Sequence, residues 1–81
     1  MKLFALLALG AVALFAAVDI NHASVKALQS VKGIGPKKAW QIVEYRKTRC
    51  FESLHDLVRI KGIGEKTFKK LEPQLTASPC R

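Results

Sequence analysis

Acidic residues are scarce in this 81-residue chain, which has 6 Asp and Glu against 14 Lys and Arg. The carboxylates are dispersed along the sequence, so none forms the spaced pair on which general acid–base catalysis depends. Serine, histidine, aspartate and cysteine are present, but no spacing indicates a nucleophilic site. We therefore predict that the chain is not an enzyme and that it uses no cofactor or small-molecule substrate.

No apolar run is long enough to cross a bilayer as a helix. Residues 3–18 carry no charge, but these 16 residues fall short of the roughly 20 required. Lys2, the apolar run and its alanines are typical of a secretory signal peptide. We predict a signal peptide over residues 1–17, cleaved after residue 13 or 17, and hence export. A buried N-terminal helix and an uncleaved membrane anchor are the alternatives.

Cysteine and histidine are equally rare, at two residues each. Cys50, Cys80, His22 and His55 lack the paired spacing of zinc ligands, so we predict no metal site. In an oxidising compartment the two cysteines favour a Cys50–Cys80 disulfide, which would contribute roughly 3–4 kcal/mol by closing its loop. Two free thiols or an intermolecular bridge remain open.

Strand-like alternation of apolar and polar residues is absent over any useful length, so we predict an all-α domain over residues 18–75 with a tail over residues 76–81. Apolar residues instead recur at helical spacing in four segments, which predicts four to five short helices. Asn21 or Ser24 is expected to cap the first helix, and Pro36 to open the second. Ser53 and Asp56 form a capping arrangement for the third.

An internal repeat is the strongest feature that is present. Lys32-Gly33-Ile34-Gly35-Pro36-Lys37-Lys38 recurs 29 residues later as Lys61-Gly62-Ile63-Gly64-Glu65-Lys66-Thr67. Glycine adopts positive φ freely and has no Cβ to obstruct a ligand, so each copy predicts a tight turn between helices. The turn opens into a helix whose free N–H groups attract anions. Ile34 and Ile63 are expected to point inward, and two such hairpins can bury their apolar faces against each other.

The formal net charge is +8, which favours a polyanion or an anionic membrane surface as partner. A solvated basic surface is the alternative. The basic residues gather beside both glycine turns, which favours a nucleic-acid backbone over the other two. Trp40 lies about 100° around the helix from Ala39, and we expect it to be partly buried at the rim of the core.

Residues 31–39 and 60–66 are similar to the helix-hairpin-helix motif. With the apolar leader and the lead-in Val18-Asp19-Ile20-Asn21, the chain resembles the ComEA-type competence proteins over about residues 18–75. The resemblance implies a tandem helix-hairpin-helix domain that binds double-stranded DNA independently of sequence. It also implies a periplasmic role in DNA uptake during natural transformation, with an inner-membrane uptake channel as partner. A protein–protein adaptor and a DNA-scavenging or accessory DNA binder are the alternatives.

The resemblance also assigns the contacts. The amides of Gly33, Ile34 and Gly35 would hold one phosphate, and those of Gly62, Ile63 and Gly64 another, on opposite strands across a minor groove. Side-chain contacts would come from Lys37, Lys38, Lys66 and Thr67, and from Lys32 and Lys61 to adjacent phosphates. With about four phosphates neutralised, log K should fall with log salt at a slope near −3.6. Gly35→Val should strain the turn and block the approach of DNA.

Overall fold

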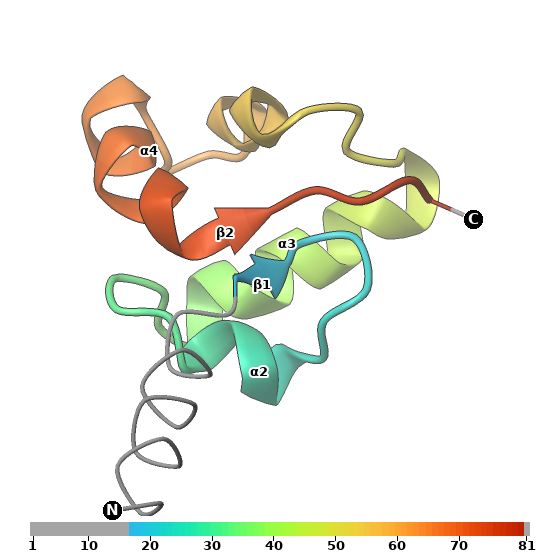
Figure 1. The fold of residues 1–81 in the computed structure, drawn as a ribbon, viewed down its shortest axis with the longest axis horizontal. Coiled ribbons are helices and arrows are strands. Elements are labelled where there is room, and N and C mark those ends of the chain that lie inside the picture. The colour runs from blue at the N-terminus through green and yellow to red at the C-terminus, as the bar shows by residue number, and fades with distance from the viewer. Residues whose placement is uncertain (1–16, 81) are drawn as a thin grey trace, which may run out of the picture.

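The computed structural model describes residues 17–80, so the predicted signal peptide lies outside the described residues except for its last position. The elements follow in the order β1 (Val18–Asp19), α2 (Val25–Gln29), α3 (Pro36–Thr48), η1 (Leu54–Arg59), α4 (Glu65–Leu71), η2 (Glu72–Gln74) and β2 (Leu75–Thr76), where η denotes a 3-10 helix (Figure 1). The predicted helical domain is confirmed. Among residues 17–80, none of the helices has the length and hydrophobicity of a membrane span.

The helix starts follow local capping chemistry. Ser24, one of the two candidates, caps α2, and its side chain accepts a hydrogen bond from the Ala27 N–H at 3.0 Å. Pro36 is the first residue of α3, as predicted, because a proline there gives up no helical hydrogen bond. The capping arrangement of Ser53 with Asp56 is also present, although the helix that it opens is a 3-10 helix.

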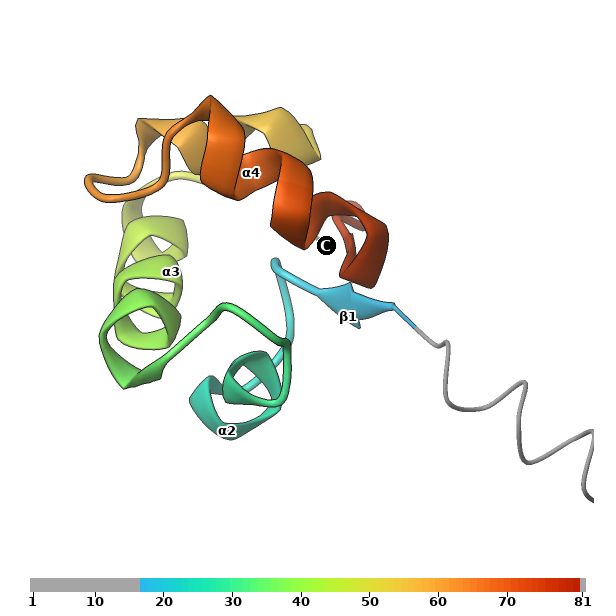
Figure 2. The same cartoon turned by 90° about the vertical axis from the view of Figure 1, so that its left-hand side faces the viewer.

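The core is built from equivalent positions of the two hairpins. Ile34 and Ile63 are 3% and 2% exposed, which confirms that both point inward. Four further pairs, each related by the 29-residue repeat, are buried in both copies: Leu28 and Leu57, Val31 and Ile60, Ala39 and Phe68, Ile42 and Leu71. Figure 2 shows the arrangement, with α2 at one end, η1 and α4 at the other, and α3 along one side. Neither hairpin could bury its apolar face alone.

A pair of two-residue strands joins the two ends of the domain. Strands β1 and β2 run parallel, with Val18 opposite Leu75 and Asp19 opposite Thr76 (Figure 1). The Ile20 N–H extends the ladder by donating to the Thr76 carbonyl at 2.9 Å. Two residues are too few to show an alternating pattern, and so the sequence did not predict these strands.

Asn21 ties the lead-in, the linker between the hairpins and the tail together. Its Nδ2 donates to the carbonyl oxygens of Phe51 at 2.9 Å and Ser78 at 2.7 Å, while its Oδ1 accepts the Phe51 N–H at 3.0 Å. The Cα atoms of Cys50 and Cys80 lie 6.0 Å apart beside this contact, a separation that suits a disulfide. The tail therefore packs on the linker, where a bond between the cysteines would hold it.

Candidate nucleic-acid interface

The first glycine of each turn is required by the backbone. Gly33 has φ +102° and Gly62 has φ +97°, a region that side-chain-bearing residues rarely adopt. A Cβ at Gly33 would also lie 2.9 Å from Cδ2 of Leu71, a buried residue of the second hairpin. Gly33 is therefore fixed both by conformation and by packing, whereas Gly62 is fixed by conformation alone.

The second glycine of each turn is required neither by the backbone conformation nor by packing. Gly35 and Gly64 precede α3 and α4 with φ −89° and −96°, which any residue can adopt. A Cβ at either position would meet nothing within 4 Å among the described residues. The expectation that Gly35→Val strains the turn is therefore wrong. What remains is an open surface at the same place in both hairpins.

The amides of the two turns are not equally available. Ile34 donates its N–H to the Val31 carbonyl at 3.0 Å, and Ile63 donates to Ile60 at the same distance. The assignment of these two amides to phosphate is therefore corrected, since each already closes its own turn. The glycine amides of the turns are different. Within residues 17–80 no backbone hydrogen bond is made by the N–H groups of Gly33, Gly35, Gly62 and Gly64.

The structure brings several predicted contact residues into one cavity between the hairpins. Lys37 and Lys38 of α3 line it together with Lys61 and Gly62 of the second turn, and its volume is about 370 Å³. Gln41 also lines it, with Nε2 3.5 Å from the Lys61 carbonyl oxygen. The sequence did not indicate Gln41, because its role depends on how the two hairpins are placed.

The remaining predicted side chains lie apart from this cavity. Lys66 is exposed and Thr67 half-buried in the first turn of α4. Lys32 is exposed on the first turn, where Gln74 holds its backbone: the Lys32 N–H donates to Oε1 at 3.1 Å, and Nε2 donates to the Lys32 carbonyl at 3.0 Å. The tail-side η2 helix thus positions the first hairpin turn.

A carboxylate distinguishes the second hairpin from the first. Glu65 opens α4 at the position where the first motif has Pro36. Its Oε2 lies 2.7 Å from Nε2 of His55, whose ring meets Phe68 edge-on at 5.1 Å. A negative charge next to Gly64 opposes a phosphate, and so the two hairpins are electrostatically unequal.

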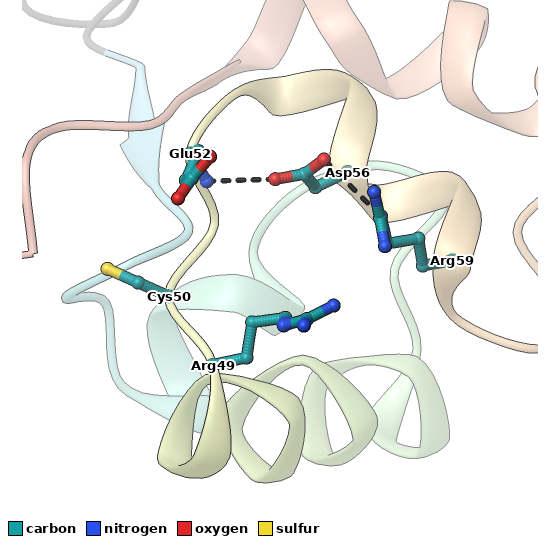
Figure 3. Close-up of a pocket in the computed structure, with 5 residues that line it drawn as sticks. All are labelled: Arg49, Cys50, Glu52, Asp56 and Arg59. Carbon is teal, nitrogen blue, oxygen red and sulfur yellow. Dashed lines mark hydrogen bonds and ion pairs between the residues drawn. The ribbon is translucent and has the colours of Figure 1, made fainter.

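A second cavity, of about 300 Å³, lies beside the linker and is lined by Arg49, Cys50, Glu52, Asp56 and Arg59 (Figure 3). The Asp56 carboxylate accepts the Glu52 N–H at 2.9 Å and lies 3.5 Å from Nε of Arg59. These contacts, the hydrogen bond from Glu52 foremost, hold the pKa of Asp56 below its usual value. Two carboxylates facing two guanidinium groups leave no excess positive charge for a phosphate.

Asp19, His22 and Ser78 come together where the tail meets the lead-in. Oδ2 of Asp19 contacts both Nδ1 of His22, at 2.7 Å, and Oγ of Ser78, which lies 3.0 Å from the same Nδ1. In a nucleophilic triad the serine and the carboxylate contact different ring nitrogens. Here both contact Nδ1, so the cluster anchors the tail and is not arranged to activate Ser78.

Two hairpins with matched glycine turns, packed on one core through equivalent residues, define a tandem helix-hairpin-helix domain. A family model described as a helix-hairpin-helix motif matches residues 15–76. The chain belongs to the helix-hairpin-helix family.

Several known proteins are similar to this chain. ComE operon protein 1 of Bacillus subtilis is 40% identical over 62 residues, which are 75% of this chain and 30% of that protein. An uncharacterized protein of Haemophilus influenzae is 42% identical over 55 residues, 65% of this chain and 49% of that protein. The human endonuclease/exonuclease/phosphatase family domain-containing protein 1 is 38% identical over 72 residues, 88% of this chain but 13% of that protein. The chain thus spans less than half of each relative, and its resemblance to ComEA-type proteins is confirmed.

Proposed function

We propose that this domain binds double-stranded DNA through the phosphate backbone without reading base sequence. The observation that carries the proposal is the open surface at Gly35 and Gly64. Neither residue needs positive φ, and no atom of the described chain would touch a Cβ there. Glycine at both places therefore allows a ligand to come close to the backbone. The neighbouring lysines favour a polyanion as that ligand.

Sequence independence follows from the chemistry of the candidate contacts. Backbone amides and lysine side chains bind phosphate oxygens, which are the same in every sequence. Reading bases in the major groove requires a helix that presents arginine, asparagine or glutamine side chains to base edges. The exposed side chains beside the hairpin turns are mainly lysines, which supports a backbone-directed mode.

Fluorescence anisotropy with labelled duplexes tests this function. We expect mature protein to bind two unrelated duplexes with equal affinity, and Gly35→Val to bind both at least about tenfold more weakly, since a bulky side chain would separate the backbones. Gln29→Val, a substitution on an exposed position of α2, is the control. Full affinity of Gly35→Val with a normally folded protein would contradict the proposal.

A protein–protein adaptor is the second candidate function. Trp40 favours it, because the side chain is 57% exposed and not partly buried as the sequence suggested. An exposed tryptophan is a common anchor of protein interfaces. Incubation with duplex DNA separates the classes: retarded intact DNA indicates a binder, cleaved DNA an enzyme, and unretarded intact DNA an adaptor. We expect retarded intact DNA, because the exposed side chains beside both glycine turns are mainly lysines.

We further propose that the protein is exported to the periplasm and acts in DNA uptake during natural transformation. The charge-free run of residues 3–18 supports export, and the closeness of Cys50 to Cys80 supports an oxidising compartment. The similarity to ComE operon protein 1 of Bacillus subtilis supports a role in competence. Mass spectrometry of the mature N-terminus tests export, and labelled-DNA uptake in a deletion strain tests the physiological role. Normal uptake and transformation in that strain would favour scavenging or an accessory role.

A further inference from the structure

We infer that the cavity between the two hairpins is a phosphate site of its own, shared by both motifs, with Gln41 as one of its ligands. The inference rests on the proposed DNA-binding function and deepens it. Separate hairpins would each hold one phosphate on the amides of their own turn. The shared cavity adds a site whose charges come from Lys37 and Lys38 of one motif and Lys61 of the other.

The charge of the cavity selects an anion. Three lysines and the Gln41 amide line it together with Gly62, and no carboxylate is among the lining residues. Among the described residues, none of the three lysines makes an ion pair with a carboxylate. Like charges that line one cavity without a carboxylate partner repel one another, and a bound anion reduces that repulsion. The linker cavity of Figure 3, in which arginines face carboxylates, lacks this property.

The lining also identifies the kind of anion. No aromatic side chain is among the lining residues, so the cavity offers no ring on which a base could stack. A volume of about 370 Å³ accommodates a phosphate group. Gly64, with its open surface, follows Gly62 by two residues, so the open part of the second turn lies next to the cavity in sequence. These features assign the site to a phosphodiester of the DNA backbone.

Gln41 bridges α3 and the second turn. Its Nε2 is 3.5 Å from the Lys61 carbonyl oxygen, so the side chain reaches from α3 to the second turn. The amide has a further N–H with which to donate to a phosphate oxygen. Gln41 is therefore placed to contact a phosphate in the cavity and the backbone of the second turn at the same time.

A double-mutant cycle in duplex binding tests whether the site is shared. Lys38→Ala and Lys61→Ala, alone and combined, are compared by anisotropy at one salt concentration, with circular dichroism to verify folding. If both lysines hold one phosphate, the loss in the double variant departs from the product of the single losses by more than about twofold. A cycle of Lys38→Ala with Lys66→Ala, which lies outside the cavity, is expected to stay within about twofold. Departures in both cycles, or in neither, overturn the shared site.

A charge placed in the cavity provides an independent test. Gln41→Glu is expected to weaken duplex binding at least about fivefold, because the carboxylate repels the phosphate. Gln29→Glu, the same change on exposed α2, is expected to have an effect below about twofold. Equal effects of the two variants overturn the assignment. Inorganic phosphate is a second probe, used at constant ionic strength. If Gln41→Glu weakens the binding of inorganic phosphate but leaves duplex affinity unchanged, the assignment is also overturned. Failure of the wild-type protein to bind duplex overturns the proposed function together with the site, whereas wild-type binding with an additive cycle removes the shared site alone.

Discussion

Gln74 pairs with the backbone of Lys32 across 42 residues of sequence, accepting from its N–H at 3.1 Å and donating to its carbonyl at 3.0 Å. The contact joins the end of the second hairpin to the turn of the first. A glutamine amide that satisfies both polar groups of one peptide residue fixes that residue as a strand partner would. The orientation of the first hairpin turn therefore depends on a side chain outside the repeat.

Replacing Gln74 by alanine should lower the free energy of unfolding by about 1 kcal/mol, since two hydrogen bonds at an exposed site are exchanged for bonds to water. Urea denaturation measures the change. Gln29→Ala, on an exposed position of α2, serves as the matched control and should change stability by less than about 0.5 kcal/mol. Equal stability of the two variants would show that the Lys32 contact contributes nothing.

The two glycines of the first turn should separate folding from binding. Gly33→Ala should destabilise the domain by about 2 kcal/mol, because it forces a side chain into positive φ and against Leu71. Gly35→Ala should cost less than about 1 kcal/mol, since its backbone is extended and its surroundings are open. Thermal denaturation of both variants checks the order. A larger loss at Gly35 than at Gly33 would reverse the assignment of roles.

Removing the carboxylate beside the second turn should strengthen DNA binding. Glu65→Gln is expected to raise duplex affinity about two- to fivefold, because it removes a charge that repels phosphate near Gly64. The same change should lower stability slightly, by about 0.3–1 kcal/mol, since it removes a favourable charge from a helix start and a partner from His55. Anisotropy measures the first effect, with Glu72→Gln of η2 as the control. Weaker binding of Glu65→Gln would indicate that no phosphate approaches this turn.

Stability should fall in acid through Asp19. Burial alone would raise the pKa of this carboxyl, but hydrogen bonds from Ser78, His22 and the Asn21 amide hold it well below its ordinary value. Because the folded-state pKa is depressed, the stabilisation is complete above the ordinary pKa of about 4 and is lost as the pH falls below it. Asp19→Asn should therefore lower stability at pH 7 and flatten its dependence below pH 4, measured by urea denaturation. An unchanged acid profile in this variant would assign the effect to other carboxylates.

Reduction should loosen the tail. If Cys50 and Cys80 are bonded, as their 6.0 Å Cα separation allows, dithiothreitol should lower the free energy of unfolding by roughly 3–4 kcal/mol. A variant with serine at both positions should be less stable and should not respond to the reductant. Intact mass measured without reductant, after alkylation in denaturant, decides whether the thiols are free. Two alkylated cysteines in the exported protein would exclude the intramolecular bond.

Much of the fold was predictable because the repeat fixes both the turns and the core. Ile34 and Ile63 had to face inward once two apolar helical stripes met at glycine turns, and the structure buries both. The start of α3 at Pro36 followed from local chemistry in the same way. These features depend on neighbours that are close in sequence or related by the repeat.

The features that sequence did not predict depend on long-range placement. Local sequence predicts Asn21 as a candidate helix cap, but its side chain contacts Phe51 and Ser78, at sequence separations of 30 and 57 residues. Helical spacing predicts Trp40 at the rim of the core, but the neighbouring elements leave its side chain exposed. The cavity at Gln41 and Lys61 exists only because the hairpins pack side by side. No local pattern encodes any of these relationships.

The central claim is that the domain grips the phosphate backbone and ignores the bases. Its most direct test is the affinity of the mature protein for unrelated duplexes, measured over a range of salt concentrations. We predict the same affinity for every sequence and a slope of log K against log salt near −3.6, the value for about four neutralised phosphates. A slope near zero, or affinities that differ more than about tenfold between duplex sequences, would contradict it.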